Sequence, residues 1–172
     1  PGCDVTKHVG ASQDYATITE GVAALPTTLT GHSCVVIRDG ATYAEQVTVQ
    51  NFVSNGSSIS IFTDPAVAAH AVVSPPLGST AAFQIANSSV NVYGIDIKPA
   101  AAISYGIVAS SPSVRLSSIN VDSAGMIWVA GVSLAGWNTV SYTSVTVQAA
   151  DGFLLSGSSA TSIAYSSASA NN

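Results

Sequence analysis

Short segments with alternating apolar and polar residues recur through the second half of the chain. Four segments carry apolar residues at their positions 1, 3, 6 and 8: Val90–Ile97, Val114–Val121, Val140–Val147 and Ile163–Ala170. Alternation is typical of a strand with one buried face, and the two residues at positions 4 and 5 shift its phase, so the chain bends before a second strand begins. A short apolar strand precedes each copy, which gives three strands per repeat.

The repeat predicts the fold class. Its copies start at residues 90, 114, 140 and 163, and three strands, two bends and a variable loop make one coil of a parallel β-helix. We therefore expect an all-β parallel β-helix of about six coils in a single domain, 1–172, with an N-terminal cap over 1–30 and coils over 31–172. An antiparallel sandwich also has short alternating strands, but it does not predict a near-constant period and phase.

Stacked coils place equivalent side chains in columns. This stacking requires that Val90, Val114 and Val140 share one inward column. The alignment predicts three inward columns: Val90, Val114, Val140 and Ile163; Val92, Leu116, Tyr142 and Tyr165; Ile95, Ile119, Val145 and Ala168.

The first half of the chain is less regular but fits the same architecture. Apolar runs predict strands at 34–37, 46–49, 59–62 and 71–73. Before them, 15–25 predicts a short amphipathic helix with Asp14 as its N-cap and Pro26 as its stop. Because unprotected strand edges are a liability, we expect this helix to cover one open end of the coils.

The composition excludes several classes of partner. The net charge is −5, charged residues make up 8% of the chain, and the basic residues are Lys7, Arg38, Lys98 and Arg115. A phosphate backbone or an anionic membrane surface needs a basic patch, so we expect neither nucleic acid nor membrane as a partner. No apolar run reaches the roughly 18 residues of a membrane span. A Ser- and Thr-rich, charge-poor chain fits an extracellular or cell-surface protein.

Two cysteines, Cys3 and Cys34, permit one disulfide that would close the N-terminal segment onto the first strand. The alternative is a pair of buried thiols. The chain begins at Pro1, which we interpret as a processed product or an excised piece. The histidines His8, His32 and His70 lie in separate irregular segments, so we expect no metal and no cofactor.

Several segments resemble the pectin lyase-like superfamily of right-handed parallel β-helices, and most of all the N-terminal half of pectin methylesterases. They are the helix at 15–22, the stretch 36–47 with Gly40, Tyr43 and Glu45 in a G-x-Y-x-E pattern, and 79–85 followed by 95–97. The resemblance spans residues 14 to 98 and implies a right-handed β-helix. It also implies esterase chemistry with two Asp residues, oxyanion-binding glutamines and an Arg, but the sequence motifs that carry those groups are missing. Tyr43 and Glu45 are expected to be structural.

Candidate catalytic groups are sparse in the sequence. A hydrolase needs paired titratable groups within hydrogen-bond reach, whereas the carboxylates here are scattered singly. No G-x-S-x-G nucleophile motif occurs. The sequence therefore indicates that the chain is not an enzyme.

Two functional interpretations remain. The first is a non-catalytic extracellular structural module of a fibre or adhesin, which associates head-to-tail with copies of itself, or with adjoining domains, through its coil ends. The second is a carbohydrate-binding or degenerate pectinesterase-like domain. Trp128 and Trp137, expected in loops, are candidate contacts for a polysaccharide or a protein partner, although a single Trp more often packs on a neighbouring loop.

Overall fold

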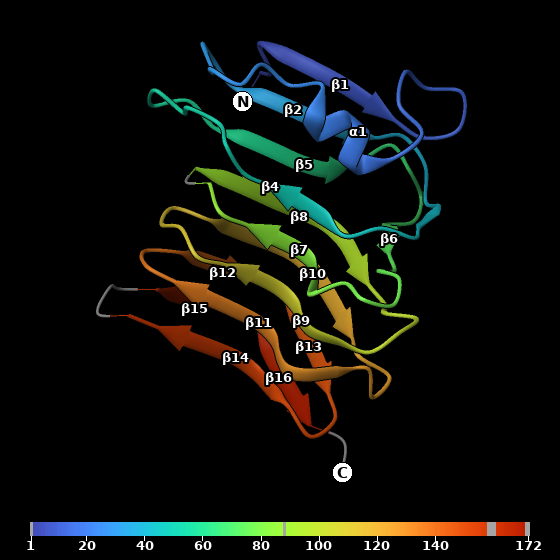
Figure 1. The fold of residues 1–172 in the computed structure, drawn as a ribbon, viewed down its shortest axis with the longest axis vertical. Helices are drawn as coiled ribbons and strands as arrows, with labels where there is room; N and C mark the ends of the chain where they lie inside the picture. Colours follow the sequence, from blue (N-terminus) through green and yellow to red (C-terminus); the bar gives the residue numbers. More distant parts are fainter. Residues whose placement is uncertain (1, 88, 158–160, 171–172) are drawn as a thin grey trace.

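Parallel strands are stacked in register from one end of the molecule to the other (Figure 1). The computed structural model describes residues 2–87, 89–157 and 161–170 and shows an all-β parallel solenoid with one short helix. The predicted fold class is confirmed. Within the described residues, no helix is long and apolar enough to cross a membrane.

The strands form three faces. The first face contains β1 (Val5–Val9), β2 (Ser33–Ile37), β5 (Ile59–Thr63), β8 (Val90–Ile97), β10 (Arg115–Asp122), β12 (Thr139–Ser141) and β15 (Ser162–Ala164). Beyond the bend, the second contains β3 (Thr42–Tyr43), β6 (Ala71–Val73), the later halves of β8 and β10, β13 (Ser144–Val147) and β16 (Ser167–Ala170). The third contains β4 (Val47–Val49), β7 (Ala81–Ile85), β9 (Ile103–Ala109), β11 (Ile127–Ala135) and β14 (Asp151–Ser156). Inward Val, Ile and Leu side chains from all three faces form one continuous core.

The solenoid has about seven turns, not the six expected. The additional turn comes from β1, which pairs in parallel with β2 and lies inside the segment that we expected to form only a cap. Its register, with Val5 opposite Ser33 and Val9 opposite Ile37, extends the first face by one strand.

The column register differs from expectation at one step. Val92 lies opposite Leu116, as predicted, but Leu116 then lies opposite Val140. The prediction that Val90, Val114 and Val140 lie in a single column is therefore wrong. The shift is two residues, so every side chain keeps its face and the solenoid is preserved, since strand side chains alternate with period two. The corrected columns are Val92, Leu116, Val140 and Ile163, and Ile97, Val121, Val145 and Ala168.

The corner between the first two faces explains the shift. Gly94, Ser118, Tyr142 and Tyr165 all have positive φ, from 48° to 63°, and form this bend in successive coils. In the repeats that start at residues 90 and 114, the bend falls at the fifth position. In the repeats that start at 140 and 163 it falls at the third position, which accounts for the shift of two residues. Tyr142 and Tyr165 therefore point outward, with 62% and 81% of their surface exposed, and their rings stack at 5.2 Å between centroids.

Helix α1 (Ile18–Ala23) packs against β1, β2 and β4 near the N-terminal end of the solenoid. Its N-cap is Thr17, not Asp14 as expected: the Thr17 side chain accepts the Glu20 N–H, and the Glu20 side chain accepts the Thr17 N–H. This reciprocal capping box satisfies two N–H groups at the start of the helix, and it decides where the helix begins.

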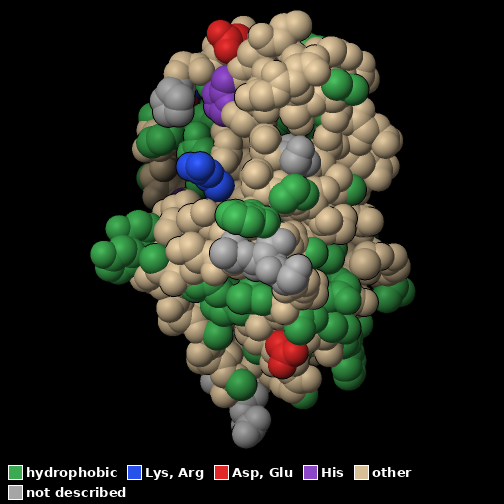
Figure 2. Space-filling model, turned by 90° about the vertical axis from the view of Figure 1, so that its left-hand side faces the viewer, with side chains coloured by type: hydrophobic (Ala, Val, Ile, Leu, Met, Phe, Trp, Pro, Cys, Tyr) green, Lys and Arg blue, Asp and Glu red, His purple; other side chains and the backbone are tan. Residues whose placement is uncertain are grey.

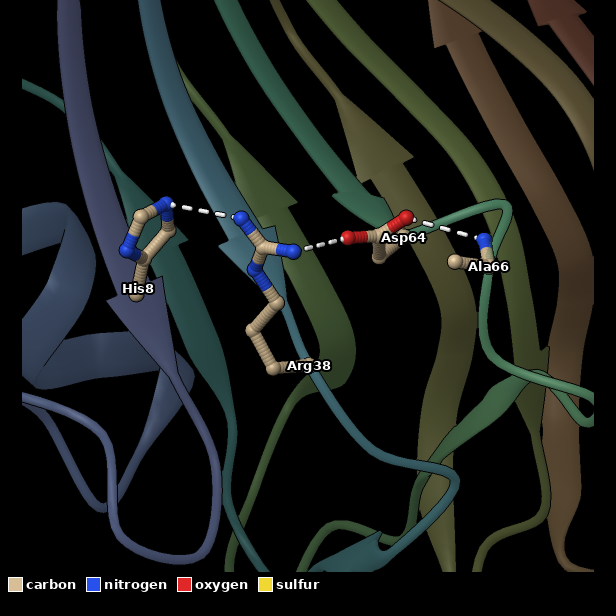
Figure 3. A network of polar contacts seen from close by, with 4 residues as sticks. All are labelled: His8, Arg38, Asp64 and Ala66. Atoms are coloured by element: carbon tan, nitrogen blue, oxygen red, sulfur yellow. Dashed lines mark hydrogen bonds and ion pairs between the residues drawn. The ribbon is translucent and has the colours of Figure 1, made fainter.

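A polar network ties the first three coils together on the outer surface (Figure 3). Arg38, which follows β2, forms an ion pair with Asp64, which follows β5, and its Nη2 lies 3.2 Å from Nε2 of His8 in β1. Asp64 also accepts the N–H of Ala66 at 2.9 Å. Because these groups hold one another across successive coils, the network is a structural tie.

Candidate functional site

A groove of about 820 Å³ runs along the outer surface of the first face. The register places outward side chains of successive strands in two rows beneath it. The first row is Ser60, Asn91, Arg115 and Thr139, and the second is Phe62, Tyr93, Ser117 and Ser141. The groove therefore offers hydroxyl and amide groups at the repeat distance of a parallel sheet, about 4.8 Å.

One aromatic pair adjoins these polar rows. Phe62 and Tyr93 stack with ring centroids 4.5 Å apart and planes inclined by 10°, and Tyr93 lines the groove. Burial raises the pKa of the Tyr93 hydroxyl, so this group is a neutral hydrogen-bond donor and acceptor at ordinary pH.

Arg115 is the cation of the groove. It is exposed, and within the described residues no carboxylate lies within ion-pair distance of its guanidinium, because the two ion pairs found there are Arg38 with Asp64 and His70 with Asp96. Charged side chains are sparse on the face shown in Figure 2, and hydrophobic side chains gather over its lower part, where the C-terminal coils lie. An unpaired guanidinium among hydroxyl and amide side chains is suited to bind an anionic ligand group.

The two tryptophans occupy different parts of the surface. Trp137 lies in the turn between β11 and β12, is 66% exposed, and lines a hollow of about 290 Å³ that shares Ser113, Arg115 and Thr139 with the groove. Trp128 is equally exposed but lies on the third face, within strand β11 and not in a loop as expected. The structure therefore brings Trp137, but not Trp128, to the groove.

A histidine with two serine partners lies at the N-terminal end of the groove. Nδ1 of His32 lies 2.5 Å from Oγ of Ser58, and Nε2 lies 3.2 Å from Oγ of Ser60. The side-chain amide of Asn91 donates to the same Ser60 oxygen at 3.1 Å. Sequence reasoning missed this cluster because His32 is 26 and 28 residues from its serine partners, which is one coil, and the serines of a Ser-rich chain carry no distinguishing signal.

The predicted disulfide joins Cys3 to Cys34, with Cα atoms 5.8 Å apart. Together with His32 these cysteines place three candidate metal-ligand atoms within 4.8 Å of one another, but both sulfurs are used by the disulfide. The other histidines lie elsewhere: His8 contacts Arg38 and His70 contacts Asp96. The absence of a metal and of a cofactor stays a prediction.

The G-x-Y-x-E segment has structural contacts. Both oxygens of Glu45 accept backbone N–H groups at the start of α1, and the Tyr43 hydroxyl donates to Asp39 at 2.7 Å. Burial and this hydrogen bond raise the pKa of Tyr43. Burial acts to raise the pKa of Asp39, but hydrogen bonds from the Ala11 N–H, the Tyr43 hydroxyl and the Ala41 N–H outweigh it, so the pKa of Asp39 is lowered.

The stacked parallel coils form a three-faced parallel β-solenoid, and the groove runs along its first face. The crystal structure of a pectin methylesterase from Aspergillus niger is similar to this chain over 98% of this chain and 87% of that one, with a TM-score of 0.56 and 11% sequence identity. No protein-family model and no curated protein sequence matches the chain.

This comparison contradicts the expectation that the chain is not an enzyme, because this solved structure of similar fold is that of an enzyme. The expectation rested on missing sequence motifs. Such motifs report one way of carrying out a reaction, whereas a coiled structure can bring other side chains together across its turns. At 11% identity the likeness establishes the fold, and an activity has to be argued from the residues of this chain.

Proposed function

We propose that this protein is an extracellular carbohydrate-related β-helix protein that binds an acidic, pectin-like polysaccharide along the groove of its first face. The observation that carries the proposal is Arg115, an exposed cation without a carboxylate partner among the described residues, set in a row of amide and hydroxyl side chains. A uronic acid carboxylate is the sugar group that a planar guanidinium binds best, through two parallel hydrogen bonds.

The remaining lining suits sugar rings. Hydroxyl groups of a sugar need donors and acceptors of both kinds, and Asn91, Ser117, Thr139 and Ser141 provide them along the groove. The apolar face of a sugar ring packs on an aromatic side chain, and Tyr93 and Trp137 stand on either side of the Arg115 strand. The groove is also open along the stack of coils, which suits a polymer better than a small ligand.

The comparison and the disulfide support the proposal. The similar solved structure is, by its name, a pectin methylesterase, which favours a carbohydrate that carries esterified carboxylates. A disulfide is stable in an oxidising compartment, which is consistent with a protein outside the cell.

Binding of polygalacturonate by isothermal titration calorimetry tests the proposal. We expect Arg115→Gln to weaken binding about tenfold or more, the effect of losing a charge-assisted hydrogen-bonded pair. Trp137→Ala should weaken binding, whereas Trp128→Ala, a matched control with the same 66% exposure on another face, should not. If the wild-type protein binds no acidic polysaccharide, or if Arg115→Gln binds as tightly as wild type, the proposal is wrong.

Association through the coil ends stays a separate prediction. It is supported by the last coil, in which β15 and β16 are largely exposed and Leu155, Ile163 and Tyr165 present apolar surface. Sedimentation at micromolar concentration tests it: a concentration-dependent assembly is expected, and a strictly monomeric protein would exclude it.

A further inference from the structure

We infer that Ser58 and His32 form a nucleophile and general-base pair that cleaves carboxylic esters at the N-terminal end of the groove. The inference deepens the proposed function and rests on it for the substrate, an esterified acidic polysaccharide. Ser58 directly precedes β5 and His32 directly precedes β2. The two residues meet only because β2 and β5 pair in neighbouring coils, so the sequence carries no local signal for the pair.

Hydrogen-bond geometry assigns a role to each ring nitrogen. A neutral imidazole carries one N–H and one lone pair. We assign the N–H to Nε2, where the Ser60 oxygen also accepts from Asn91, so that the Nδ1 lone pair faces the Ser58 hydroxyl at 2.5 Å. In this arrangement Ser58 is the nucleophile, and Ser60 is a positioning residue that holds the ring.

Exposure distinguishes the two serines. Ser60 is only 3% exposed, whereas Ser58 and His32 are half-buried and both line the groove. A nucleophile has to reach the carbonyl carbon of a bound substrate. Ser60 also lines the groove, but it is almost fully buried and its hydroxyl is held between His32 and Asn91, so Ser58 is the more accessible of the two.

The backbone that carries His32 is held on two sides. The His32 N–H donates to the Asp4 carboxylate at 2.7 Å, and the His32 carbonyl accepts the Asp4 N–H at 2.8 Å. The Cys3–Cys34 disulfide brackets this contact, one residue before Asp4 and two residues after His32. A general base works best when its position is fixed before the substrate binds, and these contacts provide that.

The reaction proceeds in two balanced halves. Oγ of Ser58 attacks the ester carbonyl carbon while its proton passes to Nδ1 of His32; the carbonyl–alkoxy bond then breaks, and the alcohol leaves with that proton. Water attacks the resulting acyl-serine with His32 again as base, which releases the carboxylic acid and restores the serine hydroxyl.

Arg115 defines which ester is cut. It lies two strands along the sheet from Ser60, about 10 Å at the spacing of parallel strands. A free carboxylate held by Arg115 therefore belongs to a different part of the polymer from the ester at Ser58. We expect a preference for partly esterified over fully esterified chains.

Labelling with a fluorophosphonate, a reagent that modifies activated serines, tests the pair without any polysaccharide. We expect one label per molecule at Ser58, located by peptide mass spectrometry. Ser58→Ala should abolish it, and His32→Gln should slow it about 100-fold or more, the size of a general-base contribution. Ser169→Ala is the control: Ser169 is exposed in β16, away from the groove, and its hydroxyl contacts Thr146 and no histidine, so labelling should be unchanged. The rate of methanol release from partly methylated polygalacturonate should likewise be lost in Ser58→Ala, be strongly reduced in His32→Gln and be unchanged in the control variant.

The outcomes separate the inference from the proposed function. Failure to label any serine, labelling at Ser60 in place of Ser58, or a wild-type rate in His32→Gln would overturn the inference even if the polysaccharide binds. Labelling at Ser58 in a protein that binds no acidic polysaccharide would support the pair and reject the substrate class. Because Ser58→Ala removes a single half-buried hydroxyl, a folded variant that still releases methanol at the wild-type rate would also overturn it.

Discussion

Oε1 of Glu45 accepts the backbone N–H of Ile18 at 2.8 Å, although the two residues are 27 positions apart. The other carboxylate oxygen accepts the Thr19 N–H at 2.9 Å. These N–H groups belong to the first turn of α1, where no carbonyl within the helix can accept them. Glu45 therefore attaches the helix to the first coils.

Replacing this carboxylate should loosen the helix. We expect Glu45→Ala to lower the free energy of unfolding by about 1–3 kcal/mol, because two N–H groups lose a charged acceptor. Urea denaturation followed by circular dichroism measures it. Glu45→Gln keeps one acceptor oxygen, so it should lower the free energy of unfolding less than Glu45→Ala does. Equal midpoints for Glu45→Ala and wild type would contradict the role of Glu45.

The N-cap can be tested by a pair of substitutions. Thr17→Ala should cost about 1 kcal/mol, since it removes the side-chain acceptor of the Glu20 N–H. Asp14→Ala should change stability by no more than about 0.5 kcal/mol, as is usual for surface positions. The reverse order of these two effects would show that the helix begins at Asp14 after all.

A glycine on the third face has no room for a side chain. A Cβ at Gly131 would overlap Cγ1 of Val145 and lie 3.1 Å from the Gly152 carbonyl oxygen. We expect Gly131→Ala to destabilise the fold by about 1–3 kcal/mol through overpacking of the core. Gly2→Ala is the control, because nothing lies within 4 Å of a Cβ there. Thermal unfolding compares the two, and a neutral Gly131→Ala would show that the coils relax freely.

The pKa of Asp39 predicts a response to acid. Because it is lower in the folded protein than the ordinary value of 3.8, ionised Asp39 favours folding, fully above pH 3.8 and progressively less as the pH falls through the lowered value. The Asp39→Asn variant lacks this contribution. The difference in free energy of unfolding between wild type and Asp39→Asn should therefore become smaller as the pH falls below 3.8. Tyr43→Phe removes one hydrogen-bond donor to Asp39 and so raises the pKa of Asp39. Acid unfolding of this variant should therefore occur at a higher pH than that of the wild type. A gap that stays constant below pH 3.8 would contradict this.

Reduction of the disulfide should lower the stability of the fold and, as a separate effect, slow the reaction of Ser58 with a fluorophosphonate. Cys3 and Cys34 are 31 residues apart, and opening a loop of this size lowers the free energy of unfolding by about 2–4 kcal/mol. Because the bridge also brackets His32, fluorophosphonate labelling of Ser58 should slow in reduced protein that is still folded. Denaturation with and without dithiothreitol measures the first effect. An unchanged midpoint after complete reduction would contradict it.

The parallel solenoid could be predicted because its signal is repeated. Each coil must bury its own apolar residues against the next, so the pattern that begins at Val90 returns at Val114 with the same spacing. The exact register could not be predicted at the following coil. The sequence shows where apolar residues recur, but the corner at Tyr142 depends on a positive φ, which is uncommon outside glycine and which a tyrosine does not signal in the sequence.

The site was predicted only in part. Trp137 could be singled out as a large aromatic residue in a polar turn, and the structure places it beside Arg115. The contact of His32 with Ser58 could not be singled out, because it joins two residues of common types across one turn of the solenoid.

The amino-acid sequence by itself determined the strand period, the stacking of coils and the charge-poor surface, because each follows from local alternation or from simple counts. It permitted a disulfide between Cys3 and Cys34, which the structure then showed. Only the tertiary structure decided the seventh turn, the helix N-cap, the two-residue shift of the columns and the groups that meet in the groove. The physical reason is that a solenoid makes neighbours of residues about two dozen positions apart, and a shift of two residues in one coil changes every contact across it while leaving the apolar pattern unaltered.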